Sequence, residues 1–249
     1  MKTITITAFE RPKYLAQVIN SISANNVSGW SMYAGVDPCG KKEQVEIVSI
    51  LKSIKFMPVH ISINPKRIGP TKNGFQVVSR AFGSGSVLNI HMEEDVVLSP
   101  DATEMAEWFF RRPDQDRWDA LSFLPHPNIG INDPSKPDVV YDLPLDWSMG
   151  AKGDTSYTSW GFCFTASVWR NLFCKWWTKG VVWDIGLRSG MRREGKARIL
   201  GPAISRSNHI GFESSVQPSW NGVYRSTFGN HKIYTGARGL KYVIETKFI

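Results

Sequence analysis

Cysteine and long apolar runs are scarce in this chain of 249 residues. The three cysteines, Cys39, Cys163 and Cys174, are too few and too widely spaced for a disulfide scaffold or a zinc site. No apolar stretch reaches the about 20 residues that cross a bilayer. The alternating start, Met1 to Ile6, also differs from the apolar core of a signal peptide. These absences predict a protein of a reducing compartment with a cytoplasmic location.

Acidic residues are scarce in the C-terminal part of the chain. Residues 1–124 hold 14 lysines and arginines and 13 acids, whereas residues 156–249 hold 14 and only 4. Solubility alone could account for part of the net charge of +8. Because the excess is confined to one part of the chain, it favours a positive face and a polyanionic partner.

Strand-like and helix-like segments alternate through the first half. The expected strands cover residues 3–8, 32–36, 59–63, 87–92 and 120–124, and the expected helices cover 12–23, 42–54, 70–82 and 101–111. This alternation predicts an α/β fold built from βαβ units around a mostly parallel sheet. Five prolines between residues 125 and 155 predict a long irregular connection instead, which faces the substrate or is partly disordered.

Three carboxylates, Glu93, Glu94 and Asp95, directly follow the fourth expected strand. Acids at the end of a buried parallel strand lie at the carboxyl edge of the sheet, where open α/β folds bind ligands. Their oxygens suit Mg²⁺ or Mn²⁺, which can hold a diphosphate. Taken alone, the three acids fit equally well at the N-terminus of a helix, which carboxylates stabilise.

Five short motifs follow one another along the chain. They are Glu10-Arg11, Asp37-Pro38-Cys39-Gly40, Glu93-Glu94-Asp95, Trp183-Asp184 and Pro202-Ala203-Ile204-Ser205-Arg206. In this order they resemble glycosyltransferases of the GT-A fold, most closely the N-acetylglucosaminyltransferase I family. The resemblance spans residues 3–216 and implies one GT-A domain over residues 1–249. It comprises a nucleotide-sugar-binding half at 1–124, a long loop at 125–155 and a basic acceptor-side half at 156–249.

The resemblance assigns roles on the donor side. Asp95 would be the direct ligand of Mn²⁺ or Mg²⁺, with Glu93 and Glu94 supporting the ribose and the metal-bound waters. The family has Glu-Asp-Asp where this chain has Glu-Glu-Asp, so the role of Glu94 departs from the pattern. Arg11 and Asp37 would line the pocket of a nucleotide sugar, with Asp37 accepting a hydrogen bond from uracil of a UDP-linked donor.

On the acceptor side, Asp184 matches the catalytic base of an inverting transferase. Without the resemblance, Asp184 is better explained as an acid in the first turn of a helix. Ser205 and Arg206 would lie at the nucleotide, just before a covering loop at about residues 210–216. Several GT-A enzymes use a late histidine as an additional metal ligand, but we favour a surface or loop position for His209.

Aromatic residues accompany these motifs. Eight of the ten tryptophans lie between Trp108 and Trp183, and most should be core residues. In the pair Trp176-Trp177, at least one ring should be structural, because adjacent side chains on a strand face opposite ways. His91, on the strand that carries the acids, is expected to be buried and hydrogen-bonded.

Basic residues follow Asp184 closely: Arg188, Arg192, Arg193, Lys196 and Arg198. They form either a solvated helix face or a surface that contacts phosphates. Some bacteriophages glycosylate hydroxymethylated pyrimidines in their own DNA, and a basic acceptor half favours DNA of this kind, with the base extruded to reach Asp184. The alternatives are a glycan, lipid-linked or protein acceptor, or a non-catalytic binding protein on the same fold.

Overall fold

The computed structural model describes residues 1–124, 132–145, 157–180, 182–212 and 232–245. Its strands are β1 Lys2–Ala8, β2 Trp30–Val36, β3 Val59–Ile63, β4 Leu88–Glu93, β5 Val96–Leu98, β6 Ala120–Ser122, β7 Val139–Pro144, β8 Phe162–Thr165, β9 Arg198–Pro202, β10 Ser207–His209 and β11 Val243–Glu245. Its α-helices are α1 Pro12–Ser23, α2 Lys41–Ser53, α3 Gly69–Gly83, α4 Ala102–Arg111, α5 Ala166–Val168, α6 Cys174–Trp176 and α7 Trp183–Arg193. A π-helical turn, η3 Trp169–Phe173, joins α5 to α6, and a 3-10 turn, η1 Gln115–Arg117, follows α4.

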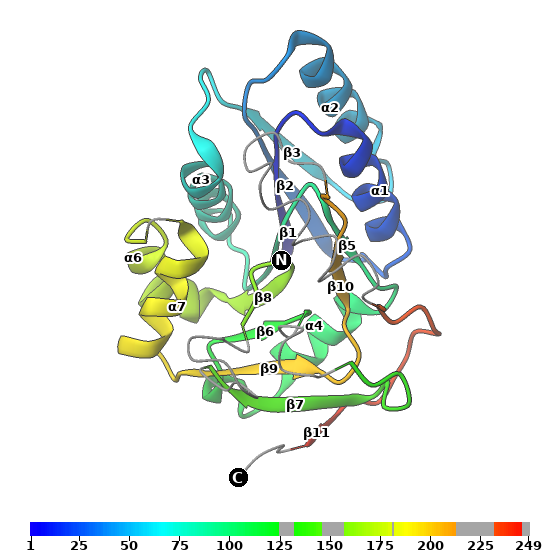
Figure 1. Cartoon of the computed structure of the whole chain (residues 1–249), viewed down its shortest axis with the longest axis vertical. Coiled ribbons are helices and arrows are strands. Elements are labelled where there is room, and N and C mark those ends of the chain that lie inside the picture. Colours follow the sequence, from blue (N-terminus) through cyan, green and yellow to red (C-terminus); the bar gives the residue numbers. More distant parts are fainter. Residues whose placement is uncertain (125–131, 146–156, 181, 213–231, 246–249) are drawn as a thin grey trace.

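Nine of the described strands form one sheet, in the order β11-β7-β9-β6-β8-β4-β1-β2-β3. Strands β3, β2, β1 and β4 are parallel, and helices lie on both sides of them, with α1 and α2 on one side and α3 on the other (Figure 1). The expected α/β fold is confirmed, and the helix at 12–23 and the strand at 59–63 begin and end at the predicted residues.

The expectation of a mostly parallel sheet holds only for this N-terminal part. Strand β8 runs antiparallel to both β4 and β6, and β7 runs antiparallel to β9. The expected irregular connection at 125–155 is also wrong in part, because residues 139–144 form β7 within the sheet. Residues 125–131 and 146–155 of that connection lie outside the described residues.

A buried polar ladder joins β1 to β4. Thr3 Oγ1 donates to Asn89 Oδ1 at 2.8 Å, and Asn89 Nδ2 donates to Thr5 Oγ1 at 2.9 Å. Thr5 Oγ1 in turn lies 2.9 Å from His91 Nδ1, and the two atoms share a hydrogen bond. Because side chains alternate across a strand, this ladder places the next residue in the series, Glu93, on the same face of the sheet as His91.

The core has two parts, one on each face of the sheet. One lies under α1, α2 and α4, and the other under α3, α6 and α7. His91 is 1% exposed in the second part, where Trp177 and Trp183 pack edge-on against its ring, so the expected burial is confirmed. Trp177 is fully buried and Trp176 only partly, which confirms a structural role for one of the pair. None of the described helices is long and apolar enough to cross a membrane.

Candidate active site

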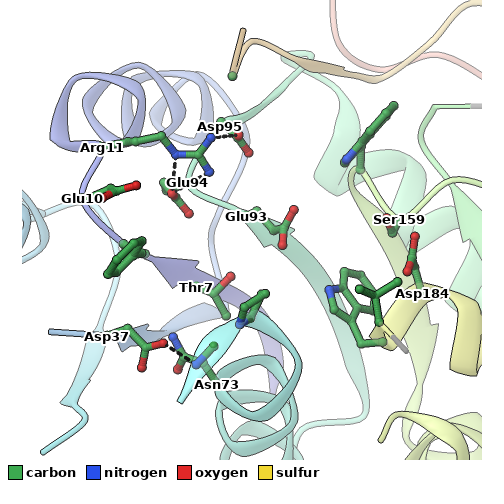
Figure 2. Close-up of a pocket in the computed structure, with 18 of the residues that line it drawn as sticks. Thr7, Glu10, Arg11, Asp37, Asn73, Glu93, Glu94, Asp95, Ser159 and Asp184 are labelled. Carbon is green, nitrogen blue, oxygen red and sulfur yellow. Dashed lines mark hydrogen bonds and ion pairs between the residues drawn. The ribbon is translucent and has the colours of Figure 1, made fainter. Parts of the chain in front are cut away.

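A cavity of about 300 Å³ opens where β1, β2 and β4 end. Both halves of the chain contribute to its wall, as Figure 2 shows. Residues from these strand ends and the segments that follow them lie on one side, together with three from the segment after β3 and the start of α3: Thr7, Phe9, Glu10, Arg11, Asp37, Glu93, Glu94 and Asp95, with Arg67, Gly69 and Asn73. Residues from the second half close the other side: Ser159, Trp160, Val182, Trp183, Asp184, His209 and Gly211.

The three predicted acids divide into two groups at the end of β4. Glu93 is the last residue of the strand and projects between the other acids and Asp184 (Figure 2). Glu94 and Asp95 form the turn that leads into β5, and both bind Arg11. The alternative of a helix N-terminus is therefore wrong, because a strand and not a helix follows the acids.

Arg11 holds the acidic turn together. Its Nε and Nη2 atoms each lie 2.7 Å from Glu94 Oε1, and Nη1 lies 2.6 Å from Asp95 Oδ2. Burial alone would lower the pKa of Arg11, but the two carboxylates outweigh it and raise this pKa. The preceding residue, Glu10, has a φ of 46°, a conformation that is uncommon outside glycine and that turns the chain from β1 into α1.

Asp95 is linked to the C-terminal half through β10. This strand pairs antiparallel with β5, which places His209 beside Val96, so that His209 Nε2 lies 3.1 Å from Asp95 Oδ2. Burial alone would raise the pKa of Asp95, but His209 and Arg11 lower it to about 2. His209 is only 4% exposed, so the favoured surface position was wrong.

Gly211 allows this close arrangement. A Cβ atom at this position would lie 2.0 Å from Asp95 Oδ2 and 2.9 Å from Arg11 Nη1, so no larger residue fits without displacing them. Gly211 belongs to the expected nucleotide-covering loop at 210–216, of which residues 213–216 lie outside the described residues.

Asp95 and His209 fit a divalent cation that is shared with a substrate. Asp95 Oδ1 is buried and has no hydrogen-bond partner among the described residues, which is costly unless a ligand satisfies it. The carboxylate oxygen suits Mn²⁺ or Mg²⁺, and the His209 imidazole beside it is a second nearby donor. The described residues contain no cluster of three or more metal-ligating side chains. Phosphate oxygens and water would therefore complete the coordination, as is usual for Mg²⁺ at phosphate sites.

The pKa values of the other two acids, Glu93 and Glu94, are raised toward neutral pH. Burial and the neighbouring charges of Asp95 and Glu94 raise the pKa of Glu93 to about 8. Burial also raises the pKa of Glu94, to about 7, although Arg11 opposes the shift. Arg11 compensates only part of the charge of three carboxylates in one cavity wall, so a further bound cation would favour their charged forms.

Asp37 lies in the cavity wall, but its carboxylate is largely occupied. It accepts hydrogen bonds from Asn64 Nδ2 at 2.8 Å, from the backbone N–H of Gly69 at 2.8 Å and from that of Ile68 at 3.3 Å. A carboxylate has about four acceptor positions. Asp37 therefore fixes the segment before α3, with little capacity left for the expected bond to a base.

Asp184 faces the acids from the opposite wall. It lies in the first turn of α7, where Val182 is the N-cap residue, and its Oδ1 accepts from the backbone N–H of Ile185 at 2.8 Å. Burial raises the pKa of Asp184 above that of an ordinary aspartate. Asp184 therefore lies in the first turn of a helix, as expected, and its carboxylate also lines the cavity.

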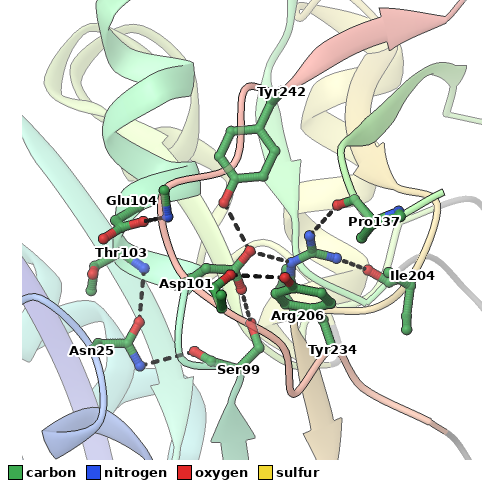
Figure 3. A network of polar contacts seen from close by, with 12 residues as sticks. Asn25, Ser99, Asp101, Thr103, Glu104, Pro137, Ile204, Arg206, Tyr234 and Tyr242 are labelled. Atoms are coloured by element: carbon green, nitrogen blue, oxygen red, sulfur yellow. Dashed lines mark hydrogen bonds and ion pairs between the residues drawn. The ribbon is translucent and has the colours of Figure 1, made fainter. Parts of the chain in front are cut away.

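Ser205 and Arg206 do not line this cavity, which corrects their expected place at the nucleotide. Both side chains are fully buried, and Arg206 Nε donates to Asp101 Oδ2 at 2.8 Å (Figure 3). Tyr242 and Ser99 also donate to Asp101, at 2.8 and 2.6 Å. The Arg206 backbone carbonyl accepts from Ser99 N–H at 2.8 Å, so this network anchors β10 to the segment after β5.

Sequence reasoning missed several residues of the cavity. Arg67 is one of them, and its guanidinium lies over the Phe9 ring at 4.2 Å. No periodic pattern marks these positions, because each belongs to a turn or a short segment. Their proximity depends on the parallel order of β1, β2 and β3, which brings the segments after β1 and β3 to one edge of the sheet.

No protein-family model and no curated protein sequence matches the chain. Solved structures do match. Residues 1–349 of Staphylococcus aureus TarS align with a TM-score of 0.55 and 12% identity, over 81% of this chain and 58% of that one. A second TarS structure gives 0.53 and 12%, over 80% and 34%. TarS is a GT-A glycosyltransferase. This chain has the GT-A fold.

A third match is more distant. The mannosyltransferase PcManGT of Pyrobaculum calidifontis, in complex with GDP-Man and Mn²⁺, has a TM-score of 0.49 and 10% identity, over 68% of this chain and 45% of that one. The chain thus spans about a third to three fifths of the length of these three structures. At 12% identity, the likeness to TarS establishes the fold alone and leaves substrates to be argued from the cavity.

Proposed function

We propose that the chain is an inverting glycosyltransferase that moves a sugar from a nucleotide sugar to an acceptor hydroxyl with the help of a divalent cation. The observation that supports this most is the cavity itself, in which Asp95 and His209 face Asp184 across a GT-A sheet end. TarS has been crystallised with UDP and with UDP-GlcNAc, which supports a UDP-linked donor. The motif order shared with the N-acetylglucosaminyltransferase I family supports inversion.

The reaction is a single displacement. The acceptor oxygen forms a bond to the anomeric carbon while the bond from that carbon to the diphosphate oxygen breaks, and the nucleoside diphosphate leaves with the electron pair. Asp184 takes the proton of the acceptor hydroxyl, and the pKa raised by burial makes it a stronger base. A bound cation would neutralise charge on the departing diphosphate. Arg11 keeps Glu94 and Asp95 in place.

A nucleotide-sugar panel tests the donor half without knowledge of the acceptor. The protein is incubated with UDP-, GDP-, and TDP-sugars, and release of free sugar is measured with Mn²⁺ and with excess chelator. We expect metal-dependent hydrolysis of a UDP-sugar, because water can take the place of the acceptor. Equal rates in chelator would contradict a metal-dependent transferase, and no release from any donor would favour a binding protein.

We further propose that the acceptor is a hydroxymethylated pyrimidine in DNA, which would place the protein in the cytoplasm of a bacterium or of a phage-infected cell. Arg192, Arg193 and Lys196 are exposed at and just after the end of α7, the helix whose first turn carries Asp184. Arg198 belongs less to this surface, because it forms an ion pair with Asp142 at 2.8 Å.

Replacing Arg192, Arg193 and Lys196 together with alanine tests the DNA surface. Each phosphate contact contributes about 0.9 to the slope of log affinity against log salt. The slope should therefore become shallower by about two to three, while UDP-sugar hydrolysis stays unchanged. The matched control replaces Lys41, Lys42 and Lys52, three exposed lysines of α2. If wild type does not bind duplex DNA at low salt, or never adds a sugar mass to hydroxymethylated DNA, the DNA acceptor is excluded.

A further inference from the structure

A second cavity of about 210 Å³ adjoins the first one at Asp184. Ser159, Trp160 and Asp184 line both cavities. The remaining lining residues also come from the second half of the chain: Tyr157, Thr158, Ile185 and Arg188. The Asp184 carboxylate therefore lies where the first cavity, which would hold the donor, meets the second one. An acceptor hydroxyl must reach this point to attack the sugar from the side opposite the diphosphate.

Arg188 is the basic residue among those that line the second cavity. It lies four residues after Asp184 on α7, so both side chains are on the same face of the helix. The two charges interact, since Arg188 lowers the pKa of Asp184 against the larger effect of burial. No described acidic residue comes within ion-pair distance of Arg188.

Other basic side chains of this region are engaged elsewhere. Arg198 pairs with Asp142, and Lys179 and Arg193 lie over the Trp176 ring at 4.5 and 5.7 Å. A partly buried guanidinium without an ion-pair partner is a favourable place for an anion, and its fork geometry suits two phosphate oxygens at once. Trp160, which is only partly buried, supplies aromatic surface beside it, on which a base can stack.

We propose that this second cavity binds the acceptor nucleotide and that Arg188 pairs with the phosphate next to that nucleotide. The inference rests on the proposed function, because a nucleotide is a meaningful occupant only if DNA is the acceptor. The small volume excludes a duplex, in line with enzymes that act on a base outside the helix. Arg188 thereby holds the reactive hydroxymethyl group at Asp184.

The experiment measures binding of small probes by calorimetry in the absence of donor. The probes are hydroxymethyl-deoxyuridine and hydroxymethyl-deoxycytidine, each as the nucleoside and as the 5′- and 3′-monophosphate. A charge-assisted hydrogen bond corresponds to about a tenfold difference in affinity or more. Wild type should bind one monophosphate at least about tenfold more tightly than its nucleoside. Arg188→Ala should remove this preference, and Arg188→Lys should retain part of it.

Arg111→Ala is the matched control, because it removes one positive charge from an exposed side chain of α4 outside both cavities. It should leave the preference for the monophosphate unchanged. A full preference in Arg188→Ala, or equal affinities of wild type for nucleoside and monophosphate, would overturn the inference.

A second measurement, on two of the same proteins, distinguishes failure of the acceptor subsite from failure of the proposed glycosyltransferase function. Metal-dependent UDP-sugar hydrolysis is measured on wild type and on Arg111→Ala, because removing Arg188 also raises the pKa of the proposed base Asp184. Hydrolysis without any phosphate preference would overturn the acceptor subsite and leave the glycosyltransferase in place. A phosphate preference that depends on Arg188, in a protein without metal-dependent hydrolysis, would support the subsite and contradict the transferase.

Discussion

The two walls of the active-site cavity are built in different ways. The donor wall consists of the ends of three hydrogen-bonded parallel strands, and its charged side chains, such as Arg11 with Glu94 and Asp95, are paired with one another. The acceptor wall consists of the first turn of α7 and the short segment 157–160, and its cation, Arg188, has no ion pair with a described residue. A rigid sheet edge suits a donor common to many enzymes, whereas loops and helix ends are where specificity changes.

The largest effect should come from removing the donor wall's central carboxylate. Asp95→Asn takes away the charge that Arg11 and His209 surround, and with it the ligand for a cation. Both sugar transfer and donor hydrolysis should fall by about a thousandfold or more, because charge on the leaving diphosphate is no longer stabilised.

Asp116→Asn is the matched control for this variant, because Asp116 is an exposed acid of η1 outside the cavity. Circular dichroism and the unfolding temperature establish that each variant folds. An Asp95→Asn protein that is folded and fully active would show that the donor wall does not hold the catalytic cation.

A smaller and more selective effect should come from the acceptor wall. Asp184→Asn should lower the rate of transfer by about 100- to 10,000-fold, the usual contribution of a positioned base. Affinity for the nucleotide sugar, measured by calorimetry, should not change, because the other wall binds it. Product with retained anomeric configuration, or an unchanged rate, would assign the base elsewhere.

The pH dependence of the wild type gives a second measurement of the same residue. Burial raises the pKa of Asp184, and the base must be deprotonated to act. The rate should therefore decrease as the pH falls through this raised pKa, at a higher pH than an exposed aspartate would allow. Asp184→Asn should lose this decrease.

Gly211 tests how closely the two halves of the chain pack together at Asp95. A Cβ at this position would lie 2.0 Å from Asp95 Oδ2, so Gly211→Ala should push the carboxylate and Arg11 from their places. Displacements of about 1 Å at a reacting centre can reduce rates by about 100-fold, and we expect a loss of about 10- to 100-fold in transfer. Gly83→Ala is the control, since its Cβ would contact nothing within 4 Å.

Sequence periodicity predicted the donor wall because that wall is made of regular elements. The acids after β4 follow from alternating strands and helices, whose parallel order brings their carboxyl ends to one edge. Arg11 and Asp37 were expected there from the family resemblance, and both line the cavity. The positions of His209 and Gly211 beside Asp95 could not be predicted from periodicity. Both depend on a three-residue strand, β10, that pairs with a strand more than 100 positions away in the sequence.

The second half of the sheet was missed for a related physical reason. Strand β7 lies in a stretch with prolines at 134, 137 and 144, which normally interrupt strands. Its pairing with β9 on one side and β11 on the other stabilises it nonetheless. Arg206 was placed at the nucleotide by its motif, although its buried ion pair with Asp101 shows that the motif is structural here.

The smallest expected effect is on the free energy of unfolding, and it concerns His91, where the two walls of the cavity pack against each other. His91 lies on β4 beneath Glu93, with the rings of Trp177 and Trp183 each 5.1 Å from its own, so it joins the donor strand to α7. Burial lowers the pKa of His91 to about 3. An unfolded histidine takes up a proton below about pH 6.5, whereas the folded one does not. Stability from this residue is therefore lost as the pH falls below 6.5.

Between pH 7 and pH 5 this difference in proton uptake amounts to about 2 kcal/mol of unfolding free energy. Other groups also titrate in this range, among them Glu93, whose raised pKa acts in the opposite direction. The comparison is therefore between proteins: urea unfolding at both pH values should show that wild type loses about 2 kcal/mol more than His91→Gln. If the two lose the same amount, protons reach His91 in the folded protein, and the two walls are less tightly joined than the packing of Trp177 and Trp183 indicates.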